Sequence, residues 1–93
     1  MSGDHARYRR PQHVEESKVG DRVVLYHCES REAVVLNPTG SWLWEFLTTS
    51  QTKPTLAEQL QSKFPSLKDE QAMSDTSAFL DDLLKHGMLI EEK

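Results

Sequence analysis

Histidine and cysteine are the residues through which this chain could bind a metal or form a covalent intermediate. The four histidines are His5, His13, His27 and His86, and Cys28 is the single cysteine. No two histidines are four positions apart, and none stands at metal-ligand spacing from a cysteine or a paired carboxylate, so we predict no metal site. His27 and Cys28 are neighbours in an expected strand, where they point to opposite faces. The imidazole is therefore badly placed to activate the thiol, and we expect Cys28 to be a small buried or half-buried residue.

The carboxylates do not suggest an acid–base pair. Glu15-Glu16 and Asp81-Asp82 are adjacent in sequence, so the two side chains of each pair diverge in a strand or in a helix. The four glycines are scattered singly and form no phosphate-binding loop. We therefore predict that the protein is not an enzyme, with no catalytic residue and no cofactor.

Size and charge narrow the class of partner. Ninety-three residues are enough for one small domain. The formal net charge is −4; residues 1–13 carry three arginines against one aspartate, a net of +2, which leaves −6 for residues 14–93. An acidic body repels phosphate and suits a basic partner, which argues against nucleic acid. No apolar run approaches the roughly 18 residues of a membrane span, and a lone cysteine fits a reducing cytoplasm, so we expect a cytoplasmic protein without membrane contact.

The first third of the chain has the pattern of a small sheet. Residues 1–11 are polar and show no hydrophobic period, so we expect a flexible N-terminal arm. Three strands are predicted over residues 12–18, 22–28 and 32–36, joined as an antiparallel meander.

The third of these strands is expected to lie at an open edge of the sheet. An exposed Val34-Val35-Leu36 edge invites pairing with another chain. Val34 and Leu36 share one face of the strand, while Ala33 and Val35 share the other. The sequence leaves open which of the two faces meets the helices.

A strand-to-helix transition is expected at Asn37-Pro38, because proline lacks the N–H that a sheet needs and is well suited to a helix start. The first helix is predicted over residues 38–48. Trp42 and Trp44 are two positions apart and cannot share a helix face. One should pack inward and the other should lie at a boundary, and the sequence does not decide which.

Two further helices complete the predicted domain. The second spans about residues 56–64 and begins with a capping box headed by Thr55. The third and longest is capped by Ser66 or Asp69 and ends near His86, and its apolar residues follow the helical period.

The stretch VVLNPTGSWLWEFL, followed by TLAEQLQSKFP and SDTSAFLDDLLKHGML, resembles the PqqD-like family, also called RiPP recognition elements. RiPPs are ribosomally made peptides that are later modified. The resemblance implies an α+β, winged-helix-like domain over residues 12–90, with an N-terminal three-stranded antiparallel sheet followed by three α-helices. This is also the element order that the residues predict by themselves.

The resemblance also implies a binding site. In this family the leader segment of a precursor peptide adds as a further strand beside the third strand and is clamped against the third helix. The implied peptide-binding residues are Ala33, Val34, Val35 and Leu36 on the strand and Asp75, Phe79, Asp82, Leu83 and His86 on the helix. The acidic helix edge would steer a Lys-rich leader. Its charge alone favours an ordinary solvated helix face, and it is the resemblance that implies a binding role.

Our hypothesis is a non-catalytic protein that captures the leader of a precursor peptide, as stand-alone family members of lasso-peptide clusters do. The implied partners are the precursor, a leader peptidase of the cysteine-protease type and a cyclase. One alternative within the family is a peptide chaperone for a radical SAM enzyme in pyrroloquinoline quinone synthesis. An alternative from another class is a winged-helix DNA-binding regulator, which would need a basic recognition helix. The sequence does not name the precursor or the modifying enzymes.

Overall fold

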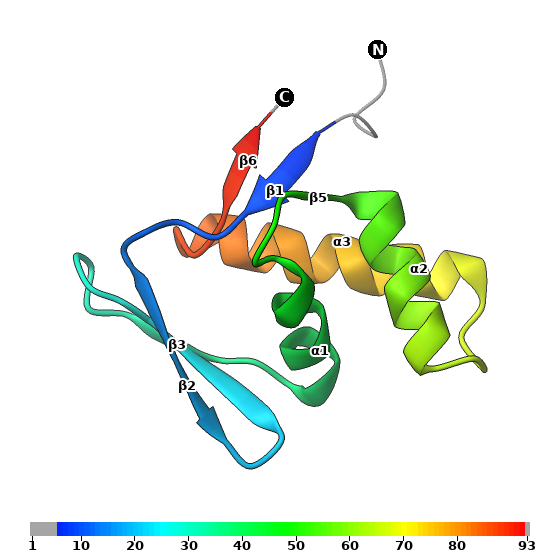
Figure 1. Ribbon diagram of the computed structural model, residues 1–93, viewed down its shortest axis with the longest axis horizontal. Coiled ribbons are helices and arrows are strands. Elements are labelled where there is room, and N and C mark those ends of the chain that lie inside the picture. The colour runs from blue at the N-terminus through cyan, green and yellow to red at the C-terminus, as the bar shows by residue number, and fades with distance from the viewer. Residues whose placement is uncertain (1–5, 93) are drawn as a thin grey trace.

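The computed structural model describes residues 6–92 of the chain. Two small antiparallel sheets and three helices surround a common core (Figure 1). The predicted series of three strands and then three helices is confirmed, and three further short strands accompany it. In chain order the elements are β1 (Arg7–Arg9), β2 (Val14–Val19), β3 (Arg22–His27), β4 (Ala33–Val35), α1 (Pro38–Phe46), β5 (Gln51–Thr52), α2 (Lys53–Lys63), α3 (Asp69–Lys85) and β6 (Ile90–Glu92).

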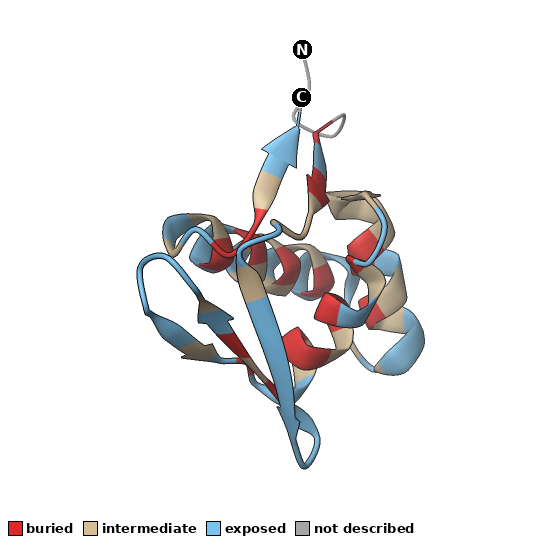
Figure 2. Ribbon diagram, turned by 60° about the vertical axis from the view of Figure 1, so that its left-hand side comes forward, coloured by how far each residue is buried: buried red, intermediate tan, exposed pale blue. Residues whose placement is uncertain are grey.

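The larger sheet has the order β2–β3–β4 and is antiparallel throughout. Its inner face is fixed by β3, where Val23 and Leu25 are buried while Tyr26 is exposed. Strand β2 is exposed along almost all of its length (Figure 2). Because β4 comes last in the order of this sheet, it lies at an edge, as the sequence predicts.

The second sheet corrects the expectation of a flexible arm over residues 1–11. Residues 7–9 form β1, which pairs with both β5 and β6; residues 1–5 lie outside the described residues. Tyr8 is 5% exposed, and the flanking arginines are hydrogen-bonded: Arg7 Nε donates to Ser50 Oγ at 2.9 Å, and Arg9 Nε to Glu92 Oε2 at 2.8 Å. Arg7 and Arg9 are thus part of the folded domain.

Helix α1 begins where the Asn37-Pro38 pair predicts. The Asn37 side chain accepts a hydrogen bond from the Gly40 N–H at 2.7 Å, which satisfies one of the free donors of the first turn. Trp44 is 1% exposed and Trp42 is half-buried. The two tryptophans therefore divide between core and boundary as their spacing requires, and Trp44 is the buried one.

Helix α2 begins earlier than predicted. It starts at Lys53 and is capped by Thr52, whose Oγ1 accepts from the Thr55 N–H at 3.4 Å. Thr55 is therefore not the cap. The proline at the second helical position can enter a first turn, because its missing N–H has no helical partner there, so the helix extends to Thr52.

Helix α3 starts without a side-chain cap. Lys68 occupies the capping position and makes no such bond, so neither Ser66 nor Asp69 has the predicted role. The Asp69 carboxylate instead accepts from Gln61 Nε2 of α2 at 2.7 Å. Gly87 ends the helix with a φ of +70°, a conformation that glycine adopts without strain.

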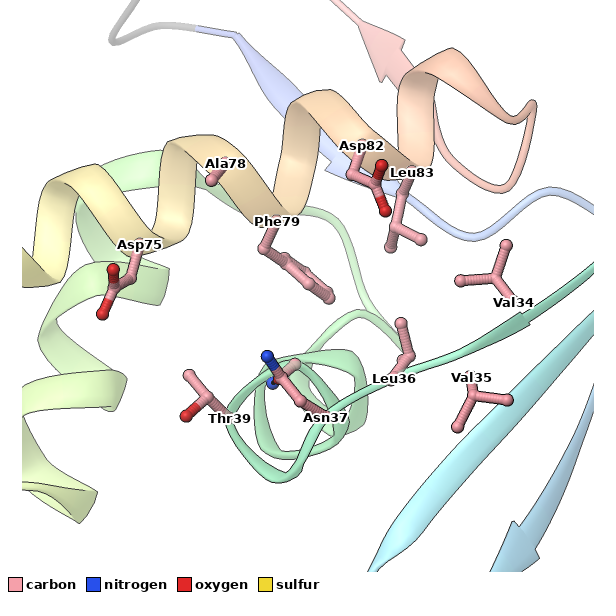
Figure 3. A pocket seen from close by; sticks show the side chains of 11 residues that line it. Val34, Val35, Leu36, Asn37, Thr39, Asp75, Ala78, Phe79, Asp82 and Leu83 are labelled. Carbon is pink, nitrogen blue, oxygen red and sulfur yellow. Dashed lines mark hydrogen bonds between the residues drawn. The ribbon is translucent and has the colours of Figure 1, made fainter.

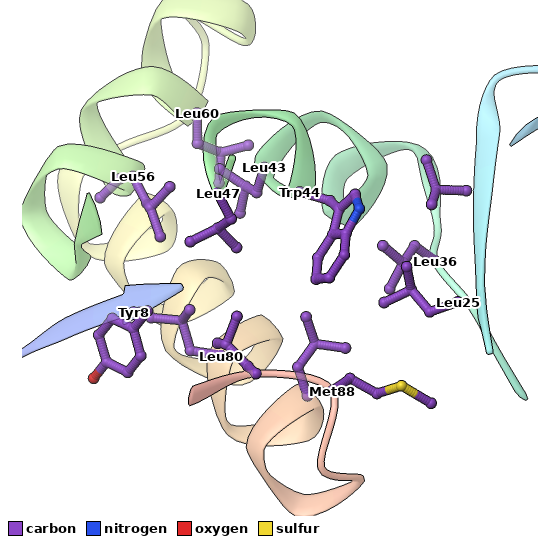
Figure 4. Packing of buried hydrophobic residues seen from close by; sticks show 14 of the residues in the cluster. Tyr8, Leu25, Leu36, Leu43, Trp44, Leu47, Leu56, Leu60, Leu80 and Met88 are labelled. Atoms are coloured by element: carbon purple, nitrogen blue, oxygen red, sulfur yellow. The ribbon is translucent and has the colours of Figure 1, made fainter. Parts of the chain in front are cut away.

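The core lies where the three helices meet the inner face of β3 (Figure 4). The apolar residues after α3 fold back onto it, with Met88 fully buried. The largest fully buried side chains are Trp44, Leu25, Leu43, Leu47, Leu56, Leu60, Leu80, Leu83 and Met88.

A polar network connects the segment after β1 to β2 and α1. The Glu16 carboxylate accepts from Arg10 Nη1 at 2.7 Å and from Trp44 Nε1 at 2.8 Å. The Arg10 guanidinium also lies over the Trp44 ring, 4.4 Å from its centroid, and donates to the Trp44 carbonyl. One glutamate thus satisfies the single polar atom of the buried tryptophan side chain.

Candidate functional site

A groove of about 480 Å³ separates β4 and the start of α1 from α3 (Figure 3). Phe79 and Leu83 point into it from α3, and Leu36 points up from the opposite wall. Its lining residues are Val34, Val35, Leu36, Asn37, Thr39, Gly40, Asp75, Ala78, Phe79, Asp82 and Leu83.

Within residues 6–92, the strand wall of the groove has a backbone edge that pairs with no other strand. The Leu36 N–H donates to the Val23 carbonyl at 2.8 Å, and the Glu32 carbonyl accepts from the His27 N–H at 2.9 Å. Even-numbered residues of this segment therefore turn their backbone polar groups toward β3. Because backbone direction alternates along an antiparallel strand, Ala33 and Val35 turn their N–H and C=O groups toward the open edge.

The structure settles which face of β4 meets the helices. Leu36 is buried and Val34 is half-buried, and both pack against the core. Val35 lies on the other face with 58% of its surface exposed. The groove therefore combines apolar side chains from one face of β4 with free backbone groups along its edge.

The helix wall of the groove follows one stripe of α3. Asp75, Ala78, Phe79, Asp82 and Leu83 stand at positions i, i+3, i+4, i+7 and i+8, which lie on one side of a helix. Apolar groups thus occupy the middle of the wall, with a carboxylate near each end. Among the described residues, no lysine or arginine lies within 4.0 Å of either carboxylate.

The structure brings seven of the nine predicted site residues to the groove: Val34, Val35, Leu36, Asp75, Phe79, Asp82 and Leu83. Ala33 and His86 are outside the lining but adjoin it. Ala33 begins β4. His86 stands between the two walls, with its Nδ1 3.4 Å from Glu32 Oε1 and its Nε2 3.7 Å from Asp82 Oδ1.

Sequence reasoning missed Ala78 and the floor residues Asn37, Thr39 and Gly40. A Cβ atom added at Gly40 would lie 3.2 Å from both Phe79 Cδ1 and Asn37 Oδ1. Gly40 therefore lets the first turn of α1 approach the Phe79 ring closely. A glycine two positions after the Asn37-Pro38 helix start was a signal for such an approach, but the facing ring comes from a helix much later in the chain.

Trp42 lies on the other side of α1, in a second cavity of about 710 Å³. Its ring packs edge-on against Phe46, with centroids 5.2 Å apart, and Lys63 Nζ lies 4.7 Å from its centroid. Neither tryptophan lines the groove between β4 and α3.

Among the described residues that could do covalent or metal chemistry, the His13 and His27 rings are neighbours, with centroids 6.5 Å apart, and Cys28 follows His27. Cys28 is exposed, which corrects the expectation of a buried or half-buried thiol; the residue lies just past the end of β3, beyond the covered face of the sheet. Desolvation and the neighbouring Glu15 carboxylate raise the pKa of this thiol. Residues 6–92 contain no group of three or more side chains placed to hold a metal ion, and none of their helices is long and apolar enough to span a membrane.

Two solved structures are similar to this fold. The structure of TbiB1 in complex with the TbiA(beta) leader peptide matches with a TM-score of 0.80 and 21% identity, over 87% of this chain and 93% of that one. A lasso peptide synthetase B1 complexed with the leader peptide matches with a TM-score of 0.78 and 22% identity, over 89% and 96%. A comparison with curated proteins finds no match.

The family itself is shown by sequence. The family model described as coenzyme PQQ synthesis protein D (PqqD) matches residues 22–89, which include β3, β4, all three helices and both walls of the groove. The chain therefore belongs to the PqqD family.

Proposed function

We propose that this protein is a non-catalytic recognition protein that binds the leader segment of a ribosomally synthesised precursor peptide, most specifically a lasso-peptide precursor. The observation that carries the proposal is the groove itself. It joins an unpaired strand edge to an apolar helix wall with a carboxylate near each end. The two similar solved structures, both leader-peptide complexes, support the same use of the fold.

In the proposed complex the leader adds as a further strand beside β4. The outward N–H and C=O groups of Ala33 and Val35 give affinity without demanding a particular sequence. Selectivity comes from side chains, because apolar leader residues enter the space between Leu36, Phe79 and Leu83.

The carboxylates of the helix wall have a separate role in this proposal. Asp75 and Asp82 attract a basic leader, which mainly raises the association rate and makes it sensitive to salt. The same charges disfavour a DNA phosphate backbone on this face.

The bound leader is then presented to separate enzymes. For a lasso precursor we propose a leader peptidase of the cysteine-protease type and a cyclase as these partners. The PqqD description of the family favours a second candidate, in which the client is the precursor of pyrroloquinoline quinone and the enzyme is a radical SAM protein. Titration with leaders of both precursor types separates the two, since the preferred client should bind at the lower concentration.

The test is a titration of fluorescein-labelled leader peptide from a neighbouring precursor gene, followed by anisotropy. Val35→Pro removes an outward N–H while leaving the β3–β4 hydrogen bonds intact. We expect saturable binding to the wild type and a loss of about tenfold or more in the variant, because a backbone hydrogen bond and the strand geometry are lost together.

Lys18→Pro is the matched control. By the same alternation, Lys18 turns its N–H outward on β2, the opposite edge of the sheet. A proline there should leave leader affinity unchanged, and circular dichroism must show that both variants are folded. Failure of every neighbouring leader to bind would refute the proposal, and duplex DNA would be titrated next.

A further inference from the structure

The spacing of Asp75 and Asp82 contains information about the sequence of the ligand. The two residues are seven positions apart on α3, which corresponds to about 10.5 Å along the helix axis. Ala78 and Phe79 lie between them on the same wall. The groove thus presents negative, apolar and negative sites in succession.

The register of a strand added beside β4 determines which ligand residues face these sites. Cross-strand neighbours share a face, so peptide residues opposite Val34 and Leu36 point into the groove, and only every second residue does so. Groove-facing residues i and i+4 are about 13.6 Å apart in an extended chain. This exceeds the aspartate spacing by about 3 Å, a gap that the flexible four-carbon stem of a lysine can span.

At the Asp82 end a second carboxylate comes from the strand side. Glu32 and Asp82 lie on two sides of the His86 ring, at 3.4 and 3.7 Å. A basic side chain entering there meets the Asp82 carboxylate of the helix wall, and the Glu32 carboxylate lies on the other side of the His86 ring. The middle position faces Phe79 and Leu36 instead, where a charge would be desolvated without a partner.

We propose that the groove selects extended segments of the form basic–x–apolar–x–basic, in which one apolar residue is flanked two positions away on each side by lysine or arginine. This inference rests on the proposed function and specifies its client. The apolar residue inserts between Leu36 and Phe79, and the two basic residues pair with Asp75 and with Asp82. Moving each basic residue by one position turns it away from the groove without changing the composition.

Two isomeric peptides test this pattern, both acetylated and amidated. The in-phase probe is Gly-Ser-Thr-Lys-Thr-Leu-Thr-Lys-Thr-Ser-Gly, and the out-of-phase probe is Gly-Ser-Thr-Thr-Lys-Leu-Lys-Thr-Thr-Ser-Gly. Dissociation constants come from ¹H–¹⁵N spectra of the labelled protein, and the amides of residues 33–36 report the site. At low salt we expect the in-phase peptide to bind about fourfold more tightly, because two partly exposed ion pairs each contribute a factor of about two.

Charge-matched variants locate the source of that preference. Asp75→Asn combined with Asp82→Asn should abolish it. Glu70→Gln combined with Asp81→Asn removes the same charge from exposed positions of α3 outside the groove and should leave it intact. Equal affinities for the two isomers in the wild type, or a preference that persists in the Asp75/Asp82 variant, would overturn the inference.

These outcomes are separable from those of the proposed function. If a natural leader binds the wild type but not Val35→Pro, while the isomers bind equally, the charge pattern is wrong and leader recognition stands. If neither a natural leader nor either isomer shifts the amides of residues 33–36, both are wrong.

Discussion

Glu16 should contribute far more to stability than its place in an exposed strand suggests. Trp44 is 1% exposed, and replacing Glu16 with alanine leaves its Nε1 without that hydrogen-bond acceptor. The same change removes the carboxylate partner of Arg10. Arg10 Nε already lacks a hydrogen-bond partner in the described structure, and without Glu16 the guanidinium would keep the Trp44 carbonyl as its acceptor there.

The size of the effect follows from these contacts. Each hydrogen bond to a charged group contributes about 1.5–3 kcal/mol, but the side chains of Arg10 and Glu16 are 24% and 35% exposed, which reduces the contribution of their ion pair. We expect Glu16→Ala to lower the free energy of unfolding by about 2–3 kcal/mol. Against a total of about 5–14 kcal/mol for a domain of this size, this corresponds to a Tm lower by about 10–20 °C.

Urea unfolding followed by far-ultraviolet circular dichroism measures this loss. Glu16→Gln retains an acceptor for the indole N–H and should lose only about 1 kcal/mol. Glu15→Ala is the control, because this exposed neighbour on the opposite face of β2 should change stability by no more than about 0.5 kcal/mol. If Glu16→Ala is as stable as Glu15→Ala, the network does not hold the domain together and the reasoning is wrong.

Three further outcomes follow from single side chains. Burial, with two nearby carboxylates, raises the pKa of Tyr8 above its usual value of 10. The folded state therefore holds the Tyr8 proton more tightly than the unfolded chain does. The resulting stabilisation of the fold is complete below pH 10 and is lost as pH rises through the folded pKa. Urea midpoints should therefore fall above pH 10 in the wild type and fall less in Tyr8→Phe. Parallel curves of urea midpoint against pH for the two proteins would contradict this prediction. Desolvation and Glu15 raise the pKa of the Cys28 thiol. At pH 8, iodoacetamide should therefore alkylate Cys28 more slowly in the folded protein than in the urea-unfolded protein, and Glu15→Gln should speed the reaction of the folded protein. Faster alkylation of the folded wild type than of the unfolded protein would contradict this prediction. Gly40→Ala should change Tm by only a few degrees, because the gain of about 1 kcal/mol in helix propensity offsets crowding against Phe79. The same substitution should weaken leader binding about tenfold by displacing the Phe79 ring into the groove. Unchanged leader affinity would show that the ring moves in another direction.

Much of the groove could be predicted because its walls follow simple periodicities. Alternation along β4 places Val34 and Leu36 together, and the 3.6-residue period of α3 places Asp75, Phe79 and Leu83 on one side. Neither pattern says how two elements face each other. That choice depends on tertiary packing, which is why the orientation of β4 became known only from the structure.

The missed features all depend on contacts between distant segments. Strand β1 is three residues long, too short to show a period, and it is stabilised by pairing with β5 and β6. Asn37, Thr39 and Gly40 have a clear local role at the start of α1, and only the approach of α3 makes them the floor of a groove.

The second sheet joins the beginning of the domain to its end, and this has a consequence for the order of folding. The Arg9–Glu92 ion pair spans 83 positions in sequence, and closing a loop of that length costs about 4 kcal/mol of chain entropy. The matched segment, residues 22–89, contains both walls of the groove and needs no such closure. Pairing of β1 with β6 is thus expected late in folding, after the groove has formed, and fluctuations of the native state should open this pair of strands before they open the groove.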